Sequence, residues 1–594
     1  MTEQKRLSPA SGFFHVSGRA AAPASLVAAA LLGACANPLG SIDSDYGRKA
    51  PAERLRQLER FESERYRAPE TPAAEGAPDA VSAVRRRFEG LERVELTLEE
   101  VRAATLARNL DLRIALIEPV RASERLREEE ARFEAVFRPR IGYRETDSPT
   151  LDVTASNQQD SGFIGGAVDI PLRTGGRVSV DLAATRSETN NPFFTLNTAY
   201  TSDLTLSLSH PLLRGAGRRV NTYSIRVASY QDQITQARTK LEVVRQLAAA
   251  DRAYWLLDAV RRSLDVAQQQ YELAVDQLAR ARRRVDAGDL PEIEVVRAEA
   301  GVAERLEAII RAENAVLNQQ RALKRLINQQ GLELHTPTMI VPASQPDPVR
   351  YEFDGPELAD GAVARRMEML ELELQIALDS SSIEFAKNQA LPAVALDYRY
   401  NIGGLGATFS DANDQLRGND FESWSVSLSG EVPLGNEGAK ARVQQAILSR
   451  LQRLATREAR EQAIRLEVLN AADNVDAGWQ RIMAARQNAL AAGRAFRAEQ
   501  RQFDVGASTS TDVLSAAARL ADAQRSEIVA LLDYQVSLVD LAYATGTLLG
   551  AAKLEWAPLD PRGGPDEDPT PPAFPFTPRG VDAGVAPVGA AGNP

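Results

Sequence analysis

Side chains that could carry out chemistry are few in this sequence and far apart. Asp286 and Asp289 could serve as a general acid and base. They flank Gly288, however, with no nucleophile or histidine nearby, so solvated charges on a turn are the favoured interpretation. A histidine metal site is not expected, because the three histidines are widely separated: His15, His210 and His335. The sequence therefore predicts no catalytic residue, no metal site, no cofactor and no enzyme.

The single cysteine, Cys35, has a more specific context. Basic residues in 1–19 precede a short apolar stretch at 20–34, which is the pattern of a secretory signal and too short to span a bilayer. The run Leu32-Gly33-Ala34-Cys35 resembles the lipobox of bacterial lipoproteins, which implies acylation of Cys35, and Ala36 at the next position implies export to the outer membrane. The alternative is an incidental cysteine after an ordinary signal. One acyl anchor holds weakly, so a second membrane element is expected.

The composition favours long helices. The net charge is −11, without a basic patch of domain size, so nucleic acid is not an expected partner. Long stretches free of proline are rich in alanine, leucine, arginine, glutamate and glutamine, which is typical of extended helix.

Two helical hairpins dominate the predicted structure. One rises over 222–287 and returns over 291–328, and the other rises over 438–505 and returns over 511–549. Apolar residues recur every three or four positions, as in coiled coils. A helix of 222–287 would be about 99 Å long and its return helix about 57 Å, so we expect a helix over 97–137, kinked at Glu118-Pro119, to continue the return helix end to end.

Strands are predicted where the apolar period changes to two. Strand pairing is expected to fill 138–212, with a hairpin turning at Thr174-Gly175-Gly176, and strands are expected again at 392–400 and 424–432. Proline and glycine mark the turns from strand to helix: Pro211 and Gly215 in the first half, Pro433 and Gly435 in the second.

These elements follow one another in the same order twice, which predicts an internal duplication. The hairpin near 163–186 has no counterpart in the second copy. The predicted domains are a signal peptide (1–34), a lipid-anchored segment and linker (35–95), a first repeat (96–328), an inter-repeat linker (329–356), a second repeat (357–550) and a disordered tail rich in proline and glycine (551–594).

Each predicted strand has one apolar and one small polar face. In an outer-membrane barrel the apolar face meets lipid and the polar face lines water. One chain has too few strands to close a barrel, and an open edge is not tolerated in lipid, so several chains would have to share one barrel. The alternative is a soluble β-domain on a helical stalk.

The pattern resembles the TolC-like outer-membrane efflux protein family. The resemblance rests on Leu96-Thr97-Leu98-Glu99-Glu100-Val101-Arg102, on the paired strand-to-helix turns, and on the tip sequence from Phe503 to Leu514, and it covers about 95–550. It implies a mainly α fold with a membrane β-barrel portion: a homotrimer whose protomers share a twelve-stranded barrel and an α-helical tunnel crossing the periplasm.

The resemblance also implies roles for the tips. The tips would dock onto a periplasmic adaptor linked to an inner-membrane pump, through Gly288, Asp289, Leu290, Gly506, Ala507 and Ser508. Glu294 and Asp512, each six residues after a tip glycine, match an acidic ring that closes the tunnel; the alternative is that they are solvated residues at helix starts. The second acid of that ring is replaced by Arg297 in one copy and Ser515 in the other.

The expected function is that of the outer-membrane channel component of a tripartite efflux or type I secretion system, a passive conduit in contact with outer-membrane lipid. The protein would be lipid-anchored in the outer membrane and extend into the periplasm. The alternative is a periplasmic coiled-coil lipoprotein that acts as a scaffold or adhesin without a pore.

Overall fold

The computed structural model describes residues 90–149, 156–191 and 193–554. Contacts divide the chain into two units, Met1–Ala77 and Pro78–Pro594, and every described residue belongs to the second. The predictions of a signal peptide and of acylation at Cys35, and nearly all of the predicted tail, lie outside the described residues. None of the described helices is both long enough and apolar enough to cross a membrane.

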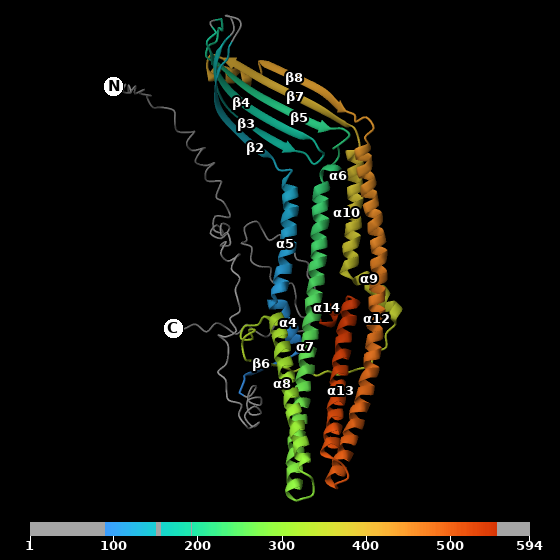
Figure 1. Cartoon of the computed structure of the whole chain (residues 1–594). Helices are drawn as coiled ribbons and strands as arrows, with labels where there is room; N and C mark the ends of the chain where they lie inside the picture. Colours follow the sequence, from blue (N-terminus) through green and yellow to red (C-terminus); the bar gives the residue numbers. More distant parts are fainter. Residues whose placement is uncertain (1–89, 150–155, 192, 555–594) are drawn as a thin grey trace, which may run out of the picture. The chain divides into compact units, whose positions relative to one another are not determined.

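The described part of the first half contains a strand, a divided helix, four further strands and a long helical hairpin (Figure 1). In order these are β1 (Arg93–Leu96), α4 (Leu98–Arg108), α5 (Leu110–Ala131), β2 (Val136–Asp147), β3 (Gln158–Pro171), β4 (Arg177–Thr189), β5 (Ala199–Pro211), α6 (Arg218–Asn221), α7 (Tyr223–Asp286) and α8 (Ile293–Ile327).

The second half has a similar order of elements with fewer strands. It comprises β6 (Met339–Pro342), α9 (Gly355–Arg365), α10 (Met367–Gln389), β7 (Ala393–Gly406), α11 (Phe409–Gly418), β8 (Phe421–Glu431), α12 (Glu437–Asp504), α13 (Ser510–Ala544) and α14 (Leu548–Ala551). The expected class, mainly α with a β-sheet, is confirmed, whereas a common origin of the two halves stays a prediction.

Both long hairpins form within one or two residues of their predicted bounds, except at the end of α13. That helix ends at Ala544 rather than near 549, because Gly546 turns the chain with φ of +69° before the short α14.

The predicted helix over 97–137 is two helices, and the kink at Glu118-Pro119 stays a prediction. The break falls at Asn109, whose side chain accepts a hydrogen bond from the backbone N–H of Leu112 and so caps α5. Pro119 lies inside α5, and the helix ends at Ala131. The start of the predicted second repeat is likewise divided, at Arg366 between α9 and α10.

End-to-end stacking beside α7 is confirmed. Both α5 and α8 pack on α7, and their neighbouring ends are joined by hydrogen bonds. Asn109 Nδ2 donates to the carbonyl of Leu326 (3.0 Å), and Asn328 Nδ2 donates to the carbonyl of Arg108 (3.1 Å). The junction lies beside a core around Tyr254 on α7, which also includes Leu323 and Ile327 of α8.

Part of the predicted linker 329–356 belongs to this core. Strand β6 pairs in parallel with β1, and Ile340 is fully buried. Tyr254 donates to the carbonyl of Leu96 in β1 (3.1 Å) and accepts from the N–H of Ser344 (2.8 Å), so it ties the two-stranded sheet to α7.

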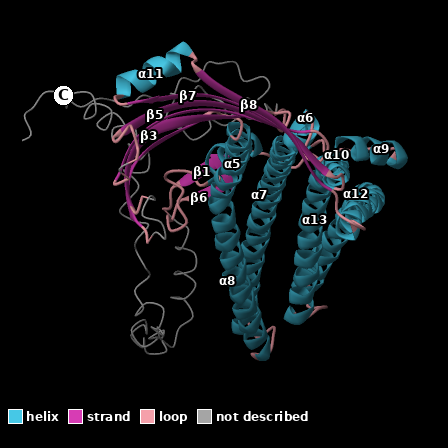
Figure 2. Ribbon diagram, turned by 90° about the horizontal axis from the view of Figure 1, so that it is seen from above, coloured by secondary structure: helices cyan, strands magenta, loops and turns pink. Residues whose placement is uncertain are grey.

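A six-stranded antiparallel sheet lies at the other end of α7 and α12 from the tips (Figure 1). Its order is β2-β3-β4-β5-β7-β8, so strands from both halves form one continuous surface. The sheet is curved, and α11 packs against β7 and β5 on its convex side (Figure 2). Gly404 and Gly406 permit this contact, because a Cβ atom at either would clash with the backbone of α11.

The two faces of this sheet differ in polarity in every strand. The pairing register of neighbouring strands places apolar side chains of all six strands on one face of the sheet. This apolar face includes Ile141, Ile164, Leu182, Leu206, Tyr400 and Val426. Several of these side chains are strongly exposed, Ile141 at 81% and Val426 at 58%. The opposite face carries charged and small polar residues such as Arg140, Asp181, Ser207, Asn401 and Ser425.

Candidate functional site at the hairpin tips

Both rising helices end in the same backbone turn. At the first tip the N–H of Gly288 donates to the carbonyl of Val285 (2.9 Å), and the N–H of Asp289 donates to that of Arg284 (2.8 Å). At the second tip the N–H of Gly506 donates to the carbonyl of Phe503 (3.0 Å) and that of Ala507 to Gln502 (2.9 Å). Each glycine has φ of +80°, the left-handed conformation that this type of helix ending requires.

The other predicted docking residues differ in exposure. Asp289 and Ala507 are exposed, whereas Leu290 is partly buried against an apolar cluster of Phe496, Phe503, Val513, Ala516 and Ala517. Ser508 donates to the carboxylate of Glu499. The tips therefore present polar backbone and small side chains outward while apolar side chains from both hairpins pack between them.

Asp512 forms the start of α13. Its carboxylate accepts from the backbone N–H of Thr509 (3.0 Å) and from the Thr509 hydroxyl (2.6 Å), while the N–H of Asp512 donates to the Thr509 hydroxyl (3.3 Å). This is a capping box, which satisfies N–H groups that a helix start leaves open. The Thr509 hydrogen bonds lower the pKa of Asp512, whose side chain remains exposed.

Glu294 lies in a different environment, 4% exposed between the two hairpins. Its Oε2 accepts from the backbone N–H of Ser510, the first residue of α13 (3.0 Å), and its Oε1 accepts from Arg297 (2.6 Å). A carboxylate at a helix N-terminus is stabilised by the N–H groups there. Glu294 thus joins the first hairpin to the second, and Arg297, which replaces the second acid of the expected ring, offsets its charge.

Arg284 joins the same two tips with the opposite charge. Its Nη1 donates to the carbonyl of Phe503 near the end of α12 (2.6 Å), and its guanidinium lies over the Phe503 ring, 5.2 Å from the centroid. A cation is favoured at a helix C-terminus as an anion is at an N-terminus. The first hairpin therefore caps both ends of the second tip, with Arg284 at the end of α12 and Glu294 at the start of α13. We call this pair the tip clamp.

The sequence interpretation did not identify Arg284 or two neighbouring contacts. Gln277 Nε2 donates to the Ser510 hydroxyl (3.4 Å), and Arg280 lies 4.0 Å from the carboxylate of Asp504. Residues 277, 280 and 284 are spaced by three and four, which places them on one face of α7. Polar residues at that spacing, on one face of α7, are the signal that could have predicted these contacts.

The strand-to-helix turns lie where expected. Pro211 ends β5 and Gly215 follows with φ of +81°, and Pro433 is followed by Gly435 with φ of +85°. The side chain of Asn388 at the end of α10 accepts from the N–H of Gly215 (2.8 Å), so the turn of the first half is fastened to a helix of the second.

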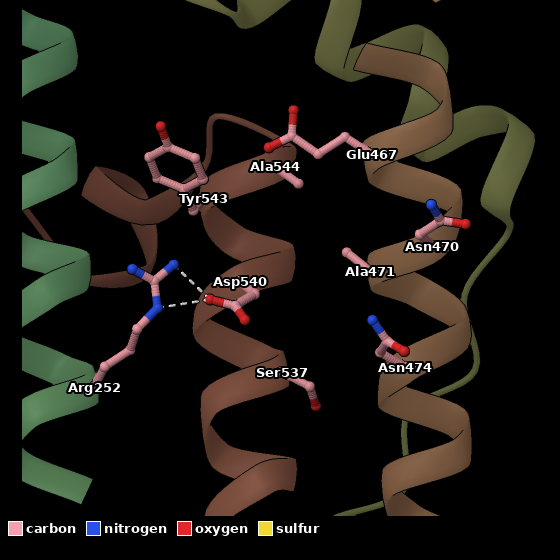
Figure 3. A pocket seen from close by; sticks show the side chains of 9 residues that line it. All are labelled: Arg252, Glu467, Asn470, Ala471, Asn474, Ser537, Asp540, Tyr543 and Ala544. Carbon is pink, nitrogen blue, oxygen red and sulfur yellow. Dashed lines mark hydrogen bonds and ion pairs between the residues drawn. The ribbon is translucent and has the colours of Figure 1, made fainter. Parts of the chain in front are cut away.

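A polar cavity of about 330 Å³ lies farther up, between α7, α12 and α13 (Figure 3). Arg252 Nε and Nη2 donate to the carboxylate of Asp540 (2.8 and 2.5 Å), and Asn470 and Asn474 line the α12 side. Its lining has no histidine or cysteine, and no described cluster of three His, Cys, Asp or Glu side chains could hold a metal ion. We assign no catalysis to it.

A buried ion-pair cluster lies at the junction of α9 and α10. Arg366 donates to Glu368, to Glu467 (2.9 Å) and to the carbonyl of Ala544 (3.1 Å), and Arg460 also donates to Glu368 (2.9 Å). Burial alone would raise the pKa of Glu368, but the hydrogen bonds from Arg366 and Arg460 outweigh burial and lower this pKa to about 2. This cluster ties α10, α12 and α13 together.

Comparison with known proteins finds similarity to channel proteins of the outer membrane. Residues 358–547 match the model of the outer membrane efflux protein family. Outer membrane protein TolC of Vibrio cholerae serotype O1 is 25% identical over 328 residues, which are 54% of this chain and 67% of that protein.

Solved structures of outer-membrane channels share the fold. The outer-membrane channel OprN superposes with a TM-score of 0.58 at 18% identity, over 81% of this chain and 98% of OprN. VceC of Vibrio cholerae superposes with a TM-score of 0.56 at 15% identity, over 76% of this chain and 96% of VceC. The family match, the relative and the fold together confirm the resemblance to the TolC-like outer-membrane efflux protein family.

Proposed function

We propose that this protein is the outer-membrane channel of a tripartite efflux or type I secretion system. It would act as a homotrimer that forms a β-barrel in the outer membrane and a helical tunnel in the periplasm. The observation that carries the proposal is the six-stranded sheet, apolar on one face and polar on the other, set at one end of two long hairpins. Such a sheet suits lipid on one side and water on the other.

Incomplete closure within one chain supports a shared barrel. β2 and β8 are the two edges of the sheet, and nearly all of their residues are exposed. Unpaired backbone groups at a sheet edge are not tolerated in lipid, so each edge needs a strand from another chain. Acylation of Cys35 would supply a second attachment to the outer membrane.

The tips are the proposed periplasmic mouth and the docking surface for an adaptor connected to an inner-membrane pump. Gly288, Asp289 and Leu290 would contact the adaptor together with Gly506, Ala507 and Ser508. Asp512, exposed at the mouth, would contribute to an acidic ring around the threefold axis, and Glu294 would support the ring by holding the tips in place. Cargo would pass without any bond being made or broken.

Single-channel recording tests this function. Purified protein reconstituted in planar bilayers is expected to give discrete conductance steps, small at rest and increased by variants that loosen the tips. Intact trimers that insert but conduct no ions under any condition would overturn the proposal and favour a scaffold or adhesin.

A further inference from the structure

The predicted extra hairpin near 163–186 is fully incorporated in the sheet. It consists of β3 and β4, which lie between β2 and β5 rather than at an edge or above the sheet. β3 pairs with β2 from Val136↔Asp169 to Asp147↔Gln158, and β4 pairs with β5 from Arg177↔Ser209 to Ser187↔Ala199. With 14 and 13 residues, β3 and β4 exceed the 9–11 residues of a typical spanning strand.

The turn of this hairpin is fitted to the strand-to-helix turn beside it. The N–H of Gly217 donates to the carbonyl of Thr174 (2.9 Å), and the Thr174 hydroxyl lies 3.2 Å from Nε2 of His210. Gly175 has φ of +100°, and a Cβ atom there would lie 2.3 Å from the carbonyl oxygen of Gly215. Only glycine permits so close an approach, so the hairpin and the start of α6 fit each other closely.

Charges on the polar face also join the hairpin to β2. Arg138 on β2 pairs with Asp169 on β3, and Arg140 donates to Asp181 on β4 (2.6 Å). Both acids belong to the hairpin and both arginines to the strand that precedes it. On the opposite face the hairpin continues the apolar surface with Ile164, Val180 and Leu182, which are 60%, 37% and 52% exposed.

We propose that the hairpin enlarges the shared barrel: three copies of this six-stranded sheet would close into eighteen strands instead of the twelve of the family. This inference rests on the proposed trimeric channel. Barrel diameter grows roughly in proportion to strand number, so the pore would be about 1.5 times as wide. Its wall would carry paired charges and serines, which suits hydrophilic cargo too large for a twelve-stranded exit.

Size-limited labelling tests the width independently of the tips. Ser425→Cys places a thiol on the polar face of β8, and Cys35→Ser removes the natural thiol. Trimers in vesicles, with the barrel mouth outward, are treated with maleimides on polyethylene glycol of increasing size. Removing residues 158–189 leaves β2 and β5 able to pair as antiparallel neighbours. We expect the deletion to reduce labelling by the larger reagents at least tenfold and to leave small maleimides unaffected.

A charge-only variant, Asp169→Asn with Asp181→Asn, is the matched control and is expected to keep the full size limit. An unchanged size limit in the deletion, with trimers and conductance intact, would overturn the wide barrel but leave the channel function standing. Absence of conductance in the unaltered protein would instead overturn the channel.

Disulfide formation tests the same arrangement if the deletion does not fold. In membrane-inserted trimers, Arg144→Cys with Ser161→Cys should link β2 to β3, and Ser179→Cys with Ser207→Cys should link β4 to β5, since these residues are register partners. Both links are expected within one chain. If Arg140→Cys with Ser207→Cys forms a link and the two pairs above do not, β2 lies beside β5 and the inference is overturned.

Discussion

Oε2 of Glu294, on the return helix of the first hairpin, accepts a hydrogen bond of 3.0 Å from the backbone N–H of Ser510, where the return helix of the second hairpin begins. Both residues are buried. The tip clamp thus places opposite charges at the two helix ends that flank the second tip, with Arg284 at the end of α12 and Glu294 at the start of α13.

Glu294→Ala should loosen the tips. The variant leaves the N–H of Ser510 and the guanidinium of Arg297 without their carboxylate, and loss of a buried hydrogen bond to a charged group costs about 2 kcal/mol. We expect higher resting conductance in planar bilayers. Glu304→Ala, an exposed carboxylate on the same helix, is the control and should conduct like the parent. Equal conductance of the two variants would contradict a clamping role for Glu294.

Arg284→Ala should have a similar effect through the other half of the clamp. It removes both the hydrogen bond to the carbonyl of Phe503 and the contact with its ring. Arg283→Ala, at the exposed neighbouring position, should leave conductance unchanged. If Arg284 and Glu294 hold one tip together, the double variant should open less than the product of the single effects predicts. Strict independence of the two substitutions would argue against a shared clamp.

Asp512→Asn tests the acidic mouth. The substitution keeps the size of the side chain and an oxygen able to accept from Thr509, but it removes three negative charges from the proposed trimer. We expect the preference for cations over anions, measured as the reversal potential in a salt gradient, to fall. Ser515→Asp, which restores an acid three residues later, should raise it. A reversal potential that moves in neither variant would remove Asp512 from the ion pathway.

The tip glycines should tolerate alanine poorly. Alanine at Gly288 or Gly506 must adopt φ of +80°, which costs roughly 1–2 kcal/mol. A Cβ atom at Gly506 would lie 3.4 Å from Nη2 of Arg284, an ordinary van der Waals contact, and one at Gly288 would have open space around it. The backbone cost is therefore the same at both tips, and Gly288→Ala and Gly506→Ala should both weaken capture of the proposed adaptor. Undiminished capture by both variants would place the docking surface elsewhere.

Acid should weaken the cluster around Glu368. Its pKa is lowered to about 2 from an ordinary value of 4.5, so its stabilisation is fully present above pH 4.5 and is lost as the pH falls toward 2. The full shift corresponds to at most about 3 kcal/mol. Denaturant unfolding followed from pH 6 to pH 3 should show a steeper loss of stability in the parent than in Glu368→Gln. Parallel curves would show that Glu368 is not the titrating group.

The sequence predicted the hairpins well because their signal is local. Apolar spacing and the turn around Gly288 and Gly506 fix a long helix and its end without reference to the rest of the chain. The division at Asn109 was missed because an asparagine can either continue a helix or cap a new one. The choice depends on contacts distant in sequence: Asn109 donates to the carbonyl of Leu326, and Asn328 donates to that of Arg108.

The sequence predicted which acidic residues lie near the tips, but not all of their partners. Position relative to glycine identified Glu294 and Asp512, but it treated them as equivalent. Asp512 bonds to Thr509, three residues away, which a capping-box pattern can predict. Glu294 bonds to Ser510, 216 positions along the chain, and no local rule reveals that partner.

The unbroken length of α7 and α12 has a mechanical consequence. A continuous helix of 64 or 68 residues transmits torsion along its axis, whereas the helices beside them are jointed at Asn109 and Arg366. Each joint is tied by a side-chain hydrogen bond to the carbonyl of a return helix, at Leu326 and Ala544. We therefore expect a twist applied at a tip to reach the sheet through α7 and α12, whose helical hydrogen bonding is unbroken. The companion helices are interrupted instead, and each interruption is fastened to a return helix.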